Sequence, residues 1–355
     1  MPQAPSSAQG AARALNPAQG AARALNPAQG AARALRAATR RSTLARTQTR
    51  HVAALLGVEV AHVLVETSGD RRGDVPVWEL GGQGAFVVEV QAAVLDGRAD
   101  FAVHSAKDLR STPTEGLVIA AVPEREDPRD ALVGATLDGL PVGARVGTGS
   151  VRRRAQLAWL RSDLTFGGLR GNIETRLGRA GDFDAIVVAL AALRRLGRTA
   201  AVAQELDPSL MLPQVAQGAL AVECRADDHE LRTLLASIEH GPSRRAVDAE
   251  RAFLAELGGG CDLPVGAFAT VDDLGTVRLD ALIASGDGRV LLRDSAEGDD
   301  PAVVGRELGR TLLDDAGGAQ LLDESAPVVT NGSGRVRGRQ DDAKPDRNGV
   351  AGTGL

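Results

Sequence analysis

Short apolar runs alternate with amphipathic stretches through the middle of the chain. The runs occur at 99–109, 116–122, 144–149 and 164–169, and helical patterns with charged faces occur at 152–161 and in the second half of 183–197. A further apolar run at 219–225 predicts another strand. Strands separated by helices predict α/β domains, in which ligands bind at the carboxyl ends of the strands.

The pattern changes from about residue 243 onward. A helical stretch at 244–259 precedes two strand-like runs at 265–271 and 277–285, and a helix is expected near 301–314. This order predicts a small α+β third domain.

Both ends of the chain differ from this body. Residues 1–34 hold two copies of AARALNPAQG, at 11–20 and 21–30, and then a further AARAL begins. Ten-residue repeats with Pro and Gly are too short to stack as a solenoid, so we expect a low-complexity, disordered extension, with an acid-free targeting peptide as the alternative. Residues 326–355 are Gly-rich and polar, and we expect a disordered tail.

Composition narrows the class of protein. The 355 residues are 43% hydrophobic and 25% charged, which is enough for two or three domains with proper cores. No apolar run approaches the roughly 20 residues of a membrane span. A net charge of -5, six Phe, two Trp and no Tyr argue against a nucleic-acid binder, because bases need cations and aromatic rings. We therefore expect a cytoplasmic protein with neither nucleic-acid nor membrane partners.

Positive charge is concentrated in one segment. Between Arg145 and Arg176 the chain has seven arginines and only two acids. The turn of small residues at 147–150 leads into Arg152 and Arg153, and a second group follows with Arg170 and Arg176. A helix N-terminus behind such a turn, reinforced by guanidinium groups, is typical of a site for carboxylates. The alternative is a solvated helix face.

Lysine is almost absent from the chain. Of 41 basic residues 39 are Arg, and Lys107 is the one lysine outside the polar tail. In such a background a single ammonium indicates a position that a guanidinium would not fit, unless it is a chance survivor. Asp108 beside it remains ionised next to a cation and is placed to stabilise a cationic intermediate.

The two cysteines lie in different contexts. Neither has a CxxC partner or a nearby His, so we expect no metal site and no disulfide. Cys224 lies in an apolar alternation and is expected in the core. Cys261 lies on a Gly-rich loop, where an inert, a catalytic and a covalent-attachment role all remain open.

Eight motifs in order give the chain a family resemblance. They are RRSTLARTQ (40–48), HSAKDL (104–109), EREDPRDAL (124–132), VGTGSVRRRAQL (146–157), LRGNIETRL (169–177), DAIVVALAALRRLG (184–197), LPQVAQGALAVECR (212–225) and GGGCDLPVG (258–266). Together they closely resemble the porphobilinogen deaminase (hydroxymethylbilane synthase) family from about residue 35 to about residue 325.

The resemblance implies an α/β fold in three domains. Two lobes like those of periplasmic binding proteins enclose a central cleft, and a small α+β C-terminal domain carries the cofactor cysteine. We expect domain 1 at 35–125 and 217–238, domain 2 at 126–216 and domain 3 at 239–325. A monomer is the simplest expectation, because the cleft lies within one chain.

The resemblance also implies the chemistry. The family is a transferase of tetrapyrrole biosynthesis: it condenses four porphobilinogen molecules on a covalent dipyrromethane cofactor, one per chain, and hydrolysis releases linear hydroxymethylbilane. Asp108 would be catalytic and Cys261 would hold the cofactor through a thioether. Cofactor contacts would come from Ser42, Lys107, Thr148, Ser150, Arg152, Arg153, Arg170 and Gln217. Porphobilinogen and the elongating polypyrrole would be bound by Arg40, Arg176, Arg195 and Phe86.

Some positions depart from the family pattern. The family usually has other residues at Gln83 (Lys), Arg110 (Pro), Gly149 (Ser), Val151 (Leu) and Ala216 (Gly).

Two other classes of protein would explain part of these sequence features. A non-catalytic binding protein for an anion would explain the arginines, and a cysteine-nucleophile enzyme would explain Cys261 but would lack an evident base.

Overall fold

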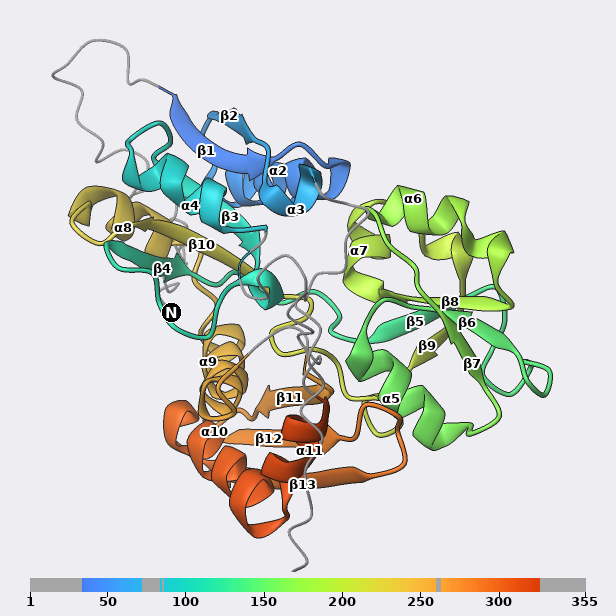
Figure 1. Cartoon of the computed structure of the whole chain (residues 1–355). Helices are drawn as coiled ribbons and strands as arrows, with labels where there is room; N and C mark the ends of the chain where they lie inside the picture. Colours follow the sequence, from blue (N-terminus) through green and yellow to red (C-terminus); the bar gives the residue numbers. More distant parts are fainter. Residues whose placement is uncertain (1–33, 72–83, 85, 260–262, 326–355) are drawn as a thin grey trace, which may run out of the picture.

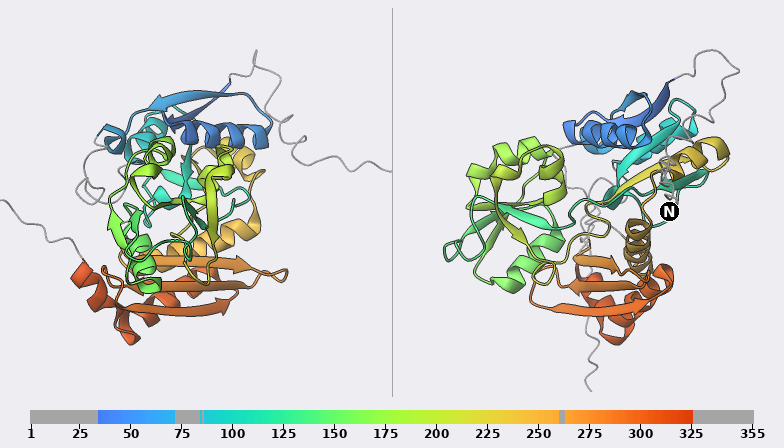
Figure 2. Two further views of the ribbon diagram at one scale, coloured as in Figure 1. Left: turned by 90° about the vertical axis from the view of Figure 1, so that its right-hand side faces the viewer. Right: turned by 180° about the vertical axis from the view of Figure 1, so that it is seen from behind.

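The structure contains three sheets, each with its own helices (Figure 1). It is a computed structural model, and the residues it describes are 34–71, 84, 86–259 and 263–325. The two larger sheets lie side by side and the third lies below them (Figures 1 and 2).

The first sheet and its helices form what we call lobe 1. Its strand order is β2-β1-β3-β10-β4, in which β1, β2 and β3 are parallel and β10 runs antiparallel to both of its neighbours. The elements are β1 (Leu35–Arg40), α2 (Thr43–Leu56), β2 (Val60–Val65), α3 (Ser68–Arg71), α4 (Val88–Leu95), β3 (Phe101–Ser105), the 3-10 turn η2 (Ala106–Asp108), β4 (Leu117–Ala121), β10 (Leu220–Arg225) and α8 (His229–Ala236).

Helices cover both faces of the lobe 1 sheet. Val52 of α2 and Leu234 of α8 pack on one face in the same apolar cluster as Phe101. Val90 and Val94 of α4 pack on the other face. Burial on both faces explains why β3 and β10 read as continuous apolar runs in the sequence.

The second sheet forms lobe 2 and repeats this plan. Its order is β7-β6-β8-β5-β9, with β6, β7 and β8 parallel and β5 antiparallel to both of its neighbours. The elements are β5 (Asp130–Val133), β6 (Arg145–Gly147), α5 (Val151–Leu160), β7 (Thr165–Gly167), α6 (Ile173–Gly178), η3 (Ala180–Asp182), β8 (Ala185–Ala189), α7 (Leu190–Arg195), η4 (Thr199–Ala201) and β9 (Val202–Leu206).

Two segments connect the lobes. One runs from β4 to β5 and the other returns from β9 to β10, so lobe 2 is inserted between the fourth and fifth strands of lobe 1. The segments meet where the backbone N–H of Glu126 donates to the carbonyl oxygen of Gly218 at 3.3 Å. The lobes also touch directly, through α2 and α7.

The third domain is a three-stranded antiparallel sheet packed against helices. The elements are α9 (Gly241–Glu256), β11 (Val265–Val271), β12 (Val277–Ala284), β13 (Leu291–Gly298), α10 (Pro301–Arg310), the π-helical turn η5 (Thr311–Asp315) and α11 (Gly318–Ser325). Helix α10 crosses α9 at Gly305, where a Cβ atom would lie 2.3 Å from the carbonyl oxygen of Ala249. Glycine is therefore required for this close approach.

The predicted fold class is confirmed, although five strands were not predicted: β1, β2, β5, β9 and β13. The alternation between 86 and 225 otherwise gives strands and helices as expected, and the third domain contains the predicted helix, strands and final helix. Strand β13 was not predicted because its sequence, LLRDSAEG, has exposed charged and polar positions at an edge of the sheet. The repeat lead, the tail, Gln83 and Cys261 lie outside the described residues.

Candidate functional site

Most of the predicted site residues follow the carboxyl ends of parallel strands, at the sides of the two lobes that approach each other. Arg40 and Ser42 follow β1, and Lys107 and Asp108 follow β3. In lobe 2, Thr148 and Ser150 follow β6, Arg170 follows β7, and Arg176 lies on α6. The predicted site residues therefore lie at or near strand ends, where ligands bind in α/β sheets.

Several of these polar residues also begin helices. The Ser42 hydroxyl accepts a hydrogen bond from the N–H of Ala45 at the start of α2, and Ser150 caps α5 in the same way. The Oγ1 of Thr148 accepts from the N–H of Ser150 at 3.1 Å. These side chains therefore stabilise the helix N-termini that face the site, whether or not they also contact a ligand.

Gln217 connects the two lobes beside Asp108. Its Oε1 accepts a hydrogen bond from Nζ of Lys107 at 3.1 Å, and its Nε2 donates to Oδ1 of Asp130 at 2.9 Å. Gln217 is fully buried in the segment that returns from lobe 2 to lobe 1. The Gln217 amide thus links Lys107 of lobe 1 to Asp130 of lobe 2 through two hydrogen bonds.

Arg152 and Arg153 both pair with the buried carboxylate of Asp130. Each guanidinium lies 2.7 Å from one carboxylate oxygen, and all three side chains are almost completely buried. Burial alone would raise the pKa of Asp130, but the two arginines outweigh it and hold that pKa far below its usual range. The sequence predicted a site for ligand carboxylates here, and the structure shows that Asp130 already neutralises part of the charge of these arginines.

The site nevertheless has a surplus of positive charge. Burial and the neighbouring Arg153 lower the pKa of Lys107 to about 8, although Asp108 and Asp130 oppose them. Burial and Arg153 likewise lower the pKa of Arg176 to about 10. The charged groups that interact here include four cations, Lys107, Arg152, Arg153 and Arg176, and two carboxylates, Asp108 and Asp130, so cations outnumber carboxylates.

This surplus fits an anionic ligand such as the dipyrromethane that the resemblance implies. The Nε atom of Arg152 is buried and has no hydrogen-bond partner among the described residues. A buried donor without a partner is costly, and a ligand carboxylate would satisfy it.

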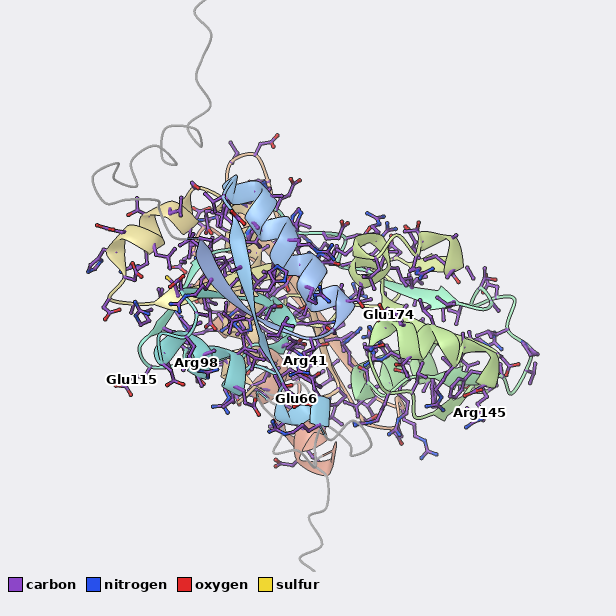
Figure 3. The ribbon with its side chains drawn as sticks, turned by 90° about the horizontal axis from the view of Figure 1, so that it is seen from above. Arg41, Glu66, Arg98, Glu115, Arg145 and Glu174 are labelled. Atoms are coloured by element: carbon purple, nitrogen blue, oxygen red, sulfur yellow. The ribbon has the colours of Figure 1, made fainter. Side chains whose placement is uncertain are left out.

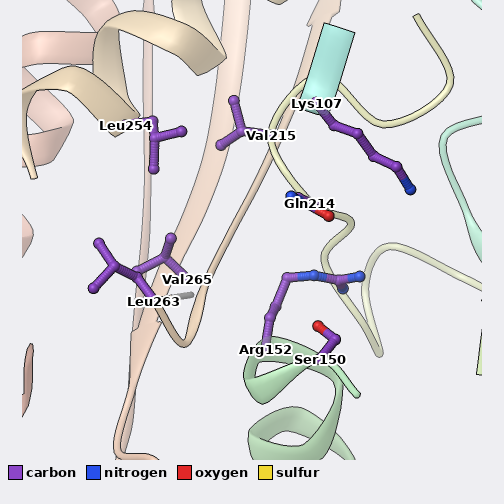
Figure 4. Close-up of a pocket in the computed structure, with 8 residues that line it drawn as sticks. All are labelled: Lys107, Ser150, Arg152, Gln214, Val215, Leu254, Leu263 and Val265. Atoms are coloured by element: carbon purple, nitrogen blue, oxygen red, sulfur yellow. The ribbon is translucent and has the colours of Figure 1, made fainter. Parts of the chain in front are cut away.

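A small pocket opens at this point, where all three parts of the chain meet (Figure 4). One side is polar and is formed by Lys107, Ser150, Arg152 and Gln214. The other side is apolar and is formed by Val215, Leu254, Leu263 and Val265. A pyrrole ring that bears carboxylates fits such a pocket, with its carboxylates toward the polar side and its ring against the apolar side. Leu263 follows the gap at 260–262 that contains Cys261, so Cys261 itself is not placed by the structure.

Arg40 is held by an acidic residue of its own lobe. It forms a bidentate pair with Asp70, with a distance of 3.2 Å from Nε to Oδ2. The guanidinium also lies 4.2 Å from the centre of the Phe86 ring, a cation–π contact. Arg40 and Phe86, both predicted to bind substrate, are therefore in contact with each other.

Arg195 is placed against a connecting segment. Its Nη2 donates to the carbonyl oxygen of Gly218 at 2.7 Å, and burial lowers its pKa to about 10. Arg110, whose orientation the sequence left open, is exposed, and its guanidinium lies beside Gly84. Ala216 has a φ of 59°, the left-handed conformation that favours the glycine usual in the family.

Three of the seven clustered arginines serve the fold instead. Arg145 lies over the Phe183 ring on the outer side of lobe 2, whereas Glu174 lies on the side that faces lobe 1 (Figure 3). Arg154 donates to the carbonyl oxygen of Gly286 at 2.7 Å, and Arg161 pairs with Asp163 at 2.8 Å. The sequence could not separate these from the four near the pocket.

Sequence analysis missed the acidic residues that organise the site. Asp130 is one, and Glu250 of α9 is another: it is fully buried and pairs with Arg125 at 2.6 Å. Glu250 also accepts the N–H groups of Ala216 and Ala269 at 2.6 and 2.8 Å. An acid at the start of the apolar run DALV was the available signal for Asp130.

Cys224 is confirmed as a core residue. It is fully buried, and desolvation raises its pKa to about 11. Within the described ranges no group of three or more His, Cys, Asp or Glu is arranged to hold a metal ion. No described helix has the length and apolarity that crossing a membrane requires.

Comparison with known proteins gives consistent matches. A family model described as "Porphobilinogen deaminase, dipyromethane cofactor binding domain" matches residues 35–233, and the model of the C-terminal domain matches 245–314. Porphobilinogen deaminase of Acidothermus cellulolyticus is 48% identical over 303 residues, covering 81% of this chain and 90% of that protein. The protein of the same name from Moorella thermoacetica is 45% identical over 309 residues, covering 84% and 97% respectively.

Proposed function

The chain belongs to the porphobilinogen deaminase family, and from this premise we propose which of its residues carry out the reaction. It is a transferase of tetrapyrrole biosynthesis with a dipyrromethane cofactor, and it condenses four porphobilinogen molecules into hydroxymethylbilane. The observation that carries our assignment is the surplus of buried cations around Asp108. Each pyrrole ring brings two carboxylates, so the growing product requires such a surplus.

Asp108 is the proposed catalytic group. Loss of ammonia from the aminomethyl arm of porphobilinogen requires a proton on the leaving nitrogen and leaves positive charge on the pyrrole. A fixed carboxylate facing the pyrrole N–H stabilises that charge while the new carbon–carbon bond forms. Lys107 beside it provides a cation for a ring carboxylate.

Binding falls to residues from both lobes. We propose that Ser42, Lys107, Thr148, Ser150, Arg152, Arg153, Arg170 and Gln217 hold the cofactor. Porphobilinogen and the polypyrrole are bound by Arg40, Arg176, Arg195 and Phe86. When bound, the dipyrromethane supplies the free pyrrole carbon to which the first substrate is joined, and it remains attached through Cys261.

Arg40 has a constraint of its own in this assignment. Its pair with Asp70 uses the Nε–Nη2 edge of the guanidinium, so a ligand carboxylate would be gripped through the Nη1–Nη2 edge while the pair is kept. The stacked Phe86 ring can stay in place, because it contacts the face of the guanidinium and not its N–H edge.

The test is the intact mass of the denatured protein, compared with that of Cys261→Ser. We expect an excess equal to two linked pyrrole units in the wild type and none in the variant. Asp108→Ala is the matched comparison. Its cysteine is intact, so it can still carry the adduct, but it should lose turnover because the catalytic carboxylate is missing. A wild type that forms no adduct after incubation with porphobilinogen, or an active Asp108→Ala, would contradict the assignment.

The remaining features are proposals of the same kind. We propose a monomer in the cytoplasm, with neither nucleic-acid nor membrane partners. We also propose domain 1 at 35–125 and 217–238, domain 2 at 126–216 and domain 3 at 239–325. The division is supported by the three separate sheets and by the meeting of the connecting segments at Glu126 and Gly218.

A further inference from the structure

Helix α9 of the third domain holds the chain immediately after Asp108. The Nη2 atom of Arg251 donates to the carbonyl oxygen of Arg110 at 2.7 Å and to that of Ser111 at 3.3 Å. These two residues come directly after Leu109, so the guanidinium binds the backbone only two and three positions beyond the proposed catalytic carboxylate.

Two further contacts fasten the same segment to α9. Leu109 is buried in one apolar cluster with Phe253 and Leu254 of α9. Ser111 lies against Gly259, just after the helix, where an added Cβ would be 2.5 Å from the Ser111 Oγ. The segment is thus packed against α9 at Leu109 and lies close to Gly259 at Ser111, an approach that the absence of a Cβ at Gly259 permits.

Arg251 is not placed there as half of an ion pair. Among the described residues no carboxylate lies within salt-bridge distance of its guanidinium, which donates instead to these two carbonyl oxygens. Burial lowers its pKa, although Glu223 and Asp248 oppose that effect. Burying a cation costs free energy unless hydrogen bonds compensate, and here the compensating bonds go to the backbone that follows Asp108.

We infer that Arg251 is a positioning residue that sets the Asp108 carboxylate relative to the helix leading into Cys261. This inference rests on the proposed roles of Asp108 and Cys261. Arg251 lies near the end of this helix, and Cys261, outside the described residues, follows the helix in the sequence. Shifting the segment would misplace the carboxylate while leaving the carboxylate-binding arginines of lobe 2 unchanged.

The test compares Arg251→Gln with Arg245→Gln. Arg245 is a matched control, because it lies on the same helix and also donates to backbone carbonyls, those of Gly275 and Asp299 within the third domain. For each purified protein we would measure kcat, KM, the thermal midpoint and the adduct mass. Arg251→Lys, which keeps the charge and can reach one carbonyl, is the second variant.

We expect Arg251→Gln to keep the adduct and its KM within about twofold, while kcat falls about tenfold or more, since sub-ångström to ångström displacements of a reacting group have such effects. Arg251→Lys should recover part of that loss, and Arg245→Gln should keep the wild-type kcat. Wild-type kcat in Arg251→Gln, or an equal fall in kcat in Arg245→Gln, would overturn the inference. If Arg251→Gln fails to fold or to load, Arg251→Lys decides by the same criterion. Failure of the proposed function would appear separately, as a wild type without adduct or an active Asp108→Ala.

Discussion

Replacing Asp130 by Asn should destabilise the protein strongly, although the two side chains have nearly the same shape. The carboxylate is fully buried and accepts hydrogen bonds from Arg152, Arg153 and Gln217. Asn keeps the volume but removes the carboxylate charge with which, among the described residues, both guanidinium groups pair, and they are 3% and 5% exposed. Removing one partner of a buried pair costs about 3–5 kcal/mol, a large part of a total stability of about 5–15 kcal/mol.

The assay is urea unfolding followed by far-UV circular dichroism. With a denaturant slope of about 2–3 kcal/mol per molar, this loss lowers the unfolding midpoint by roughly 1–2 M. Asp163→Asn removes the acid of the solvent-facing pair with Arg161 and should leave the midpoint close to that of the wild type. A midpoint for Asp130→Asn that matches this control would refute the reasoning.

The same carboxylate predicts how stability depends on pH. The pKa of Asp130 is depressed in the folded state, so its contribution is present above the unfolded carboxyl pKa of about 3.9 and is lost as the pH falls below that value. As the pH is lowered below about 4, the free energy of unfolding should therefore fall more in the wild type than in Asp130→Asn.

Three further outcomes are expected. The pKa of Lys107 is lowered to about 8 in the folded protein, so its charge is lost as the pH rises through that value and kcat/KM for porphobilinogen should fall there. Lys107→Arg that has loaded the cofactor should not show this fall. The same pH profile for the variant and the wild type would contradict the lowered pKa. Gly305→Ala should cost about 1–3 kcal/mol in urea unfolding because its Cβ would enter α9, whereas Gly178→Ala, with open space, should not destabilise. Cys224 in a Cys261→Ser background should react with a maleimide only after denaturation, and labelling of the native protein would contradict its burial.

The fold was largely predictable because its strands are buried on both faces. The run 116–122 (GLVIAAV), for example, is apolar throughout, and amphipathic stretches such as 152–161 have the period of surface helices. Strand β13 escaped because its exposed edge position tolerates Arg293, Asp294 and Glu297. Hydrophobic pattern does not distinguish such an edge strand from a loop.

The candidate site was predictable in its residue types but not in its pairing. The sequence indicated an excess of cations and singled out Lys107 and Asp108. It could not show that Asp130 neutralises part of the charge on Arg152 and Arg153, because these residues are separated by more than 20 positions and meet only through the fold. The role of Arg251 was hidden for the same reason, since its partners are backbone carbonyls 140 and 141 positions away.

The position of β10 has a consequence for the order in which the protein assembles during synthesis. Among the described strands, β4 pairs with β10 alone, and β10 also fills the place beside β3. About 100 residues, including all of lobe 2, separate β4 from β10, and at about 5–20 residues per second the ribosome needs roughly 5–20 s to make them. Lobe 2 is complete by the end of that time, whereas lobe 1 presents β3 as an unpaired edge throughout it and β4 has no partner. The nascent chain is therefore most prone to aggregation in the part made first, and helper proteins that bind exposed strand edges would act there.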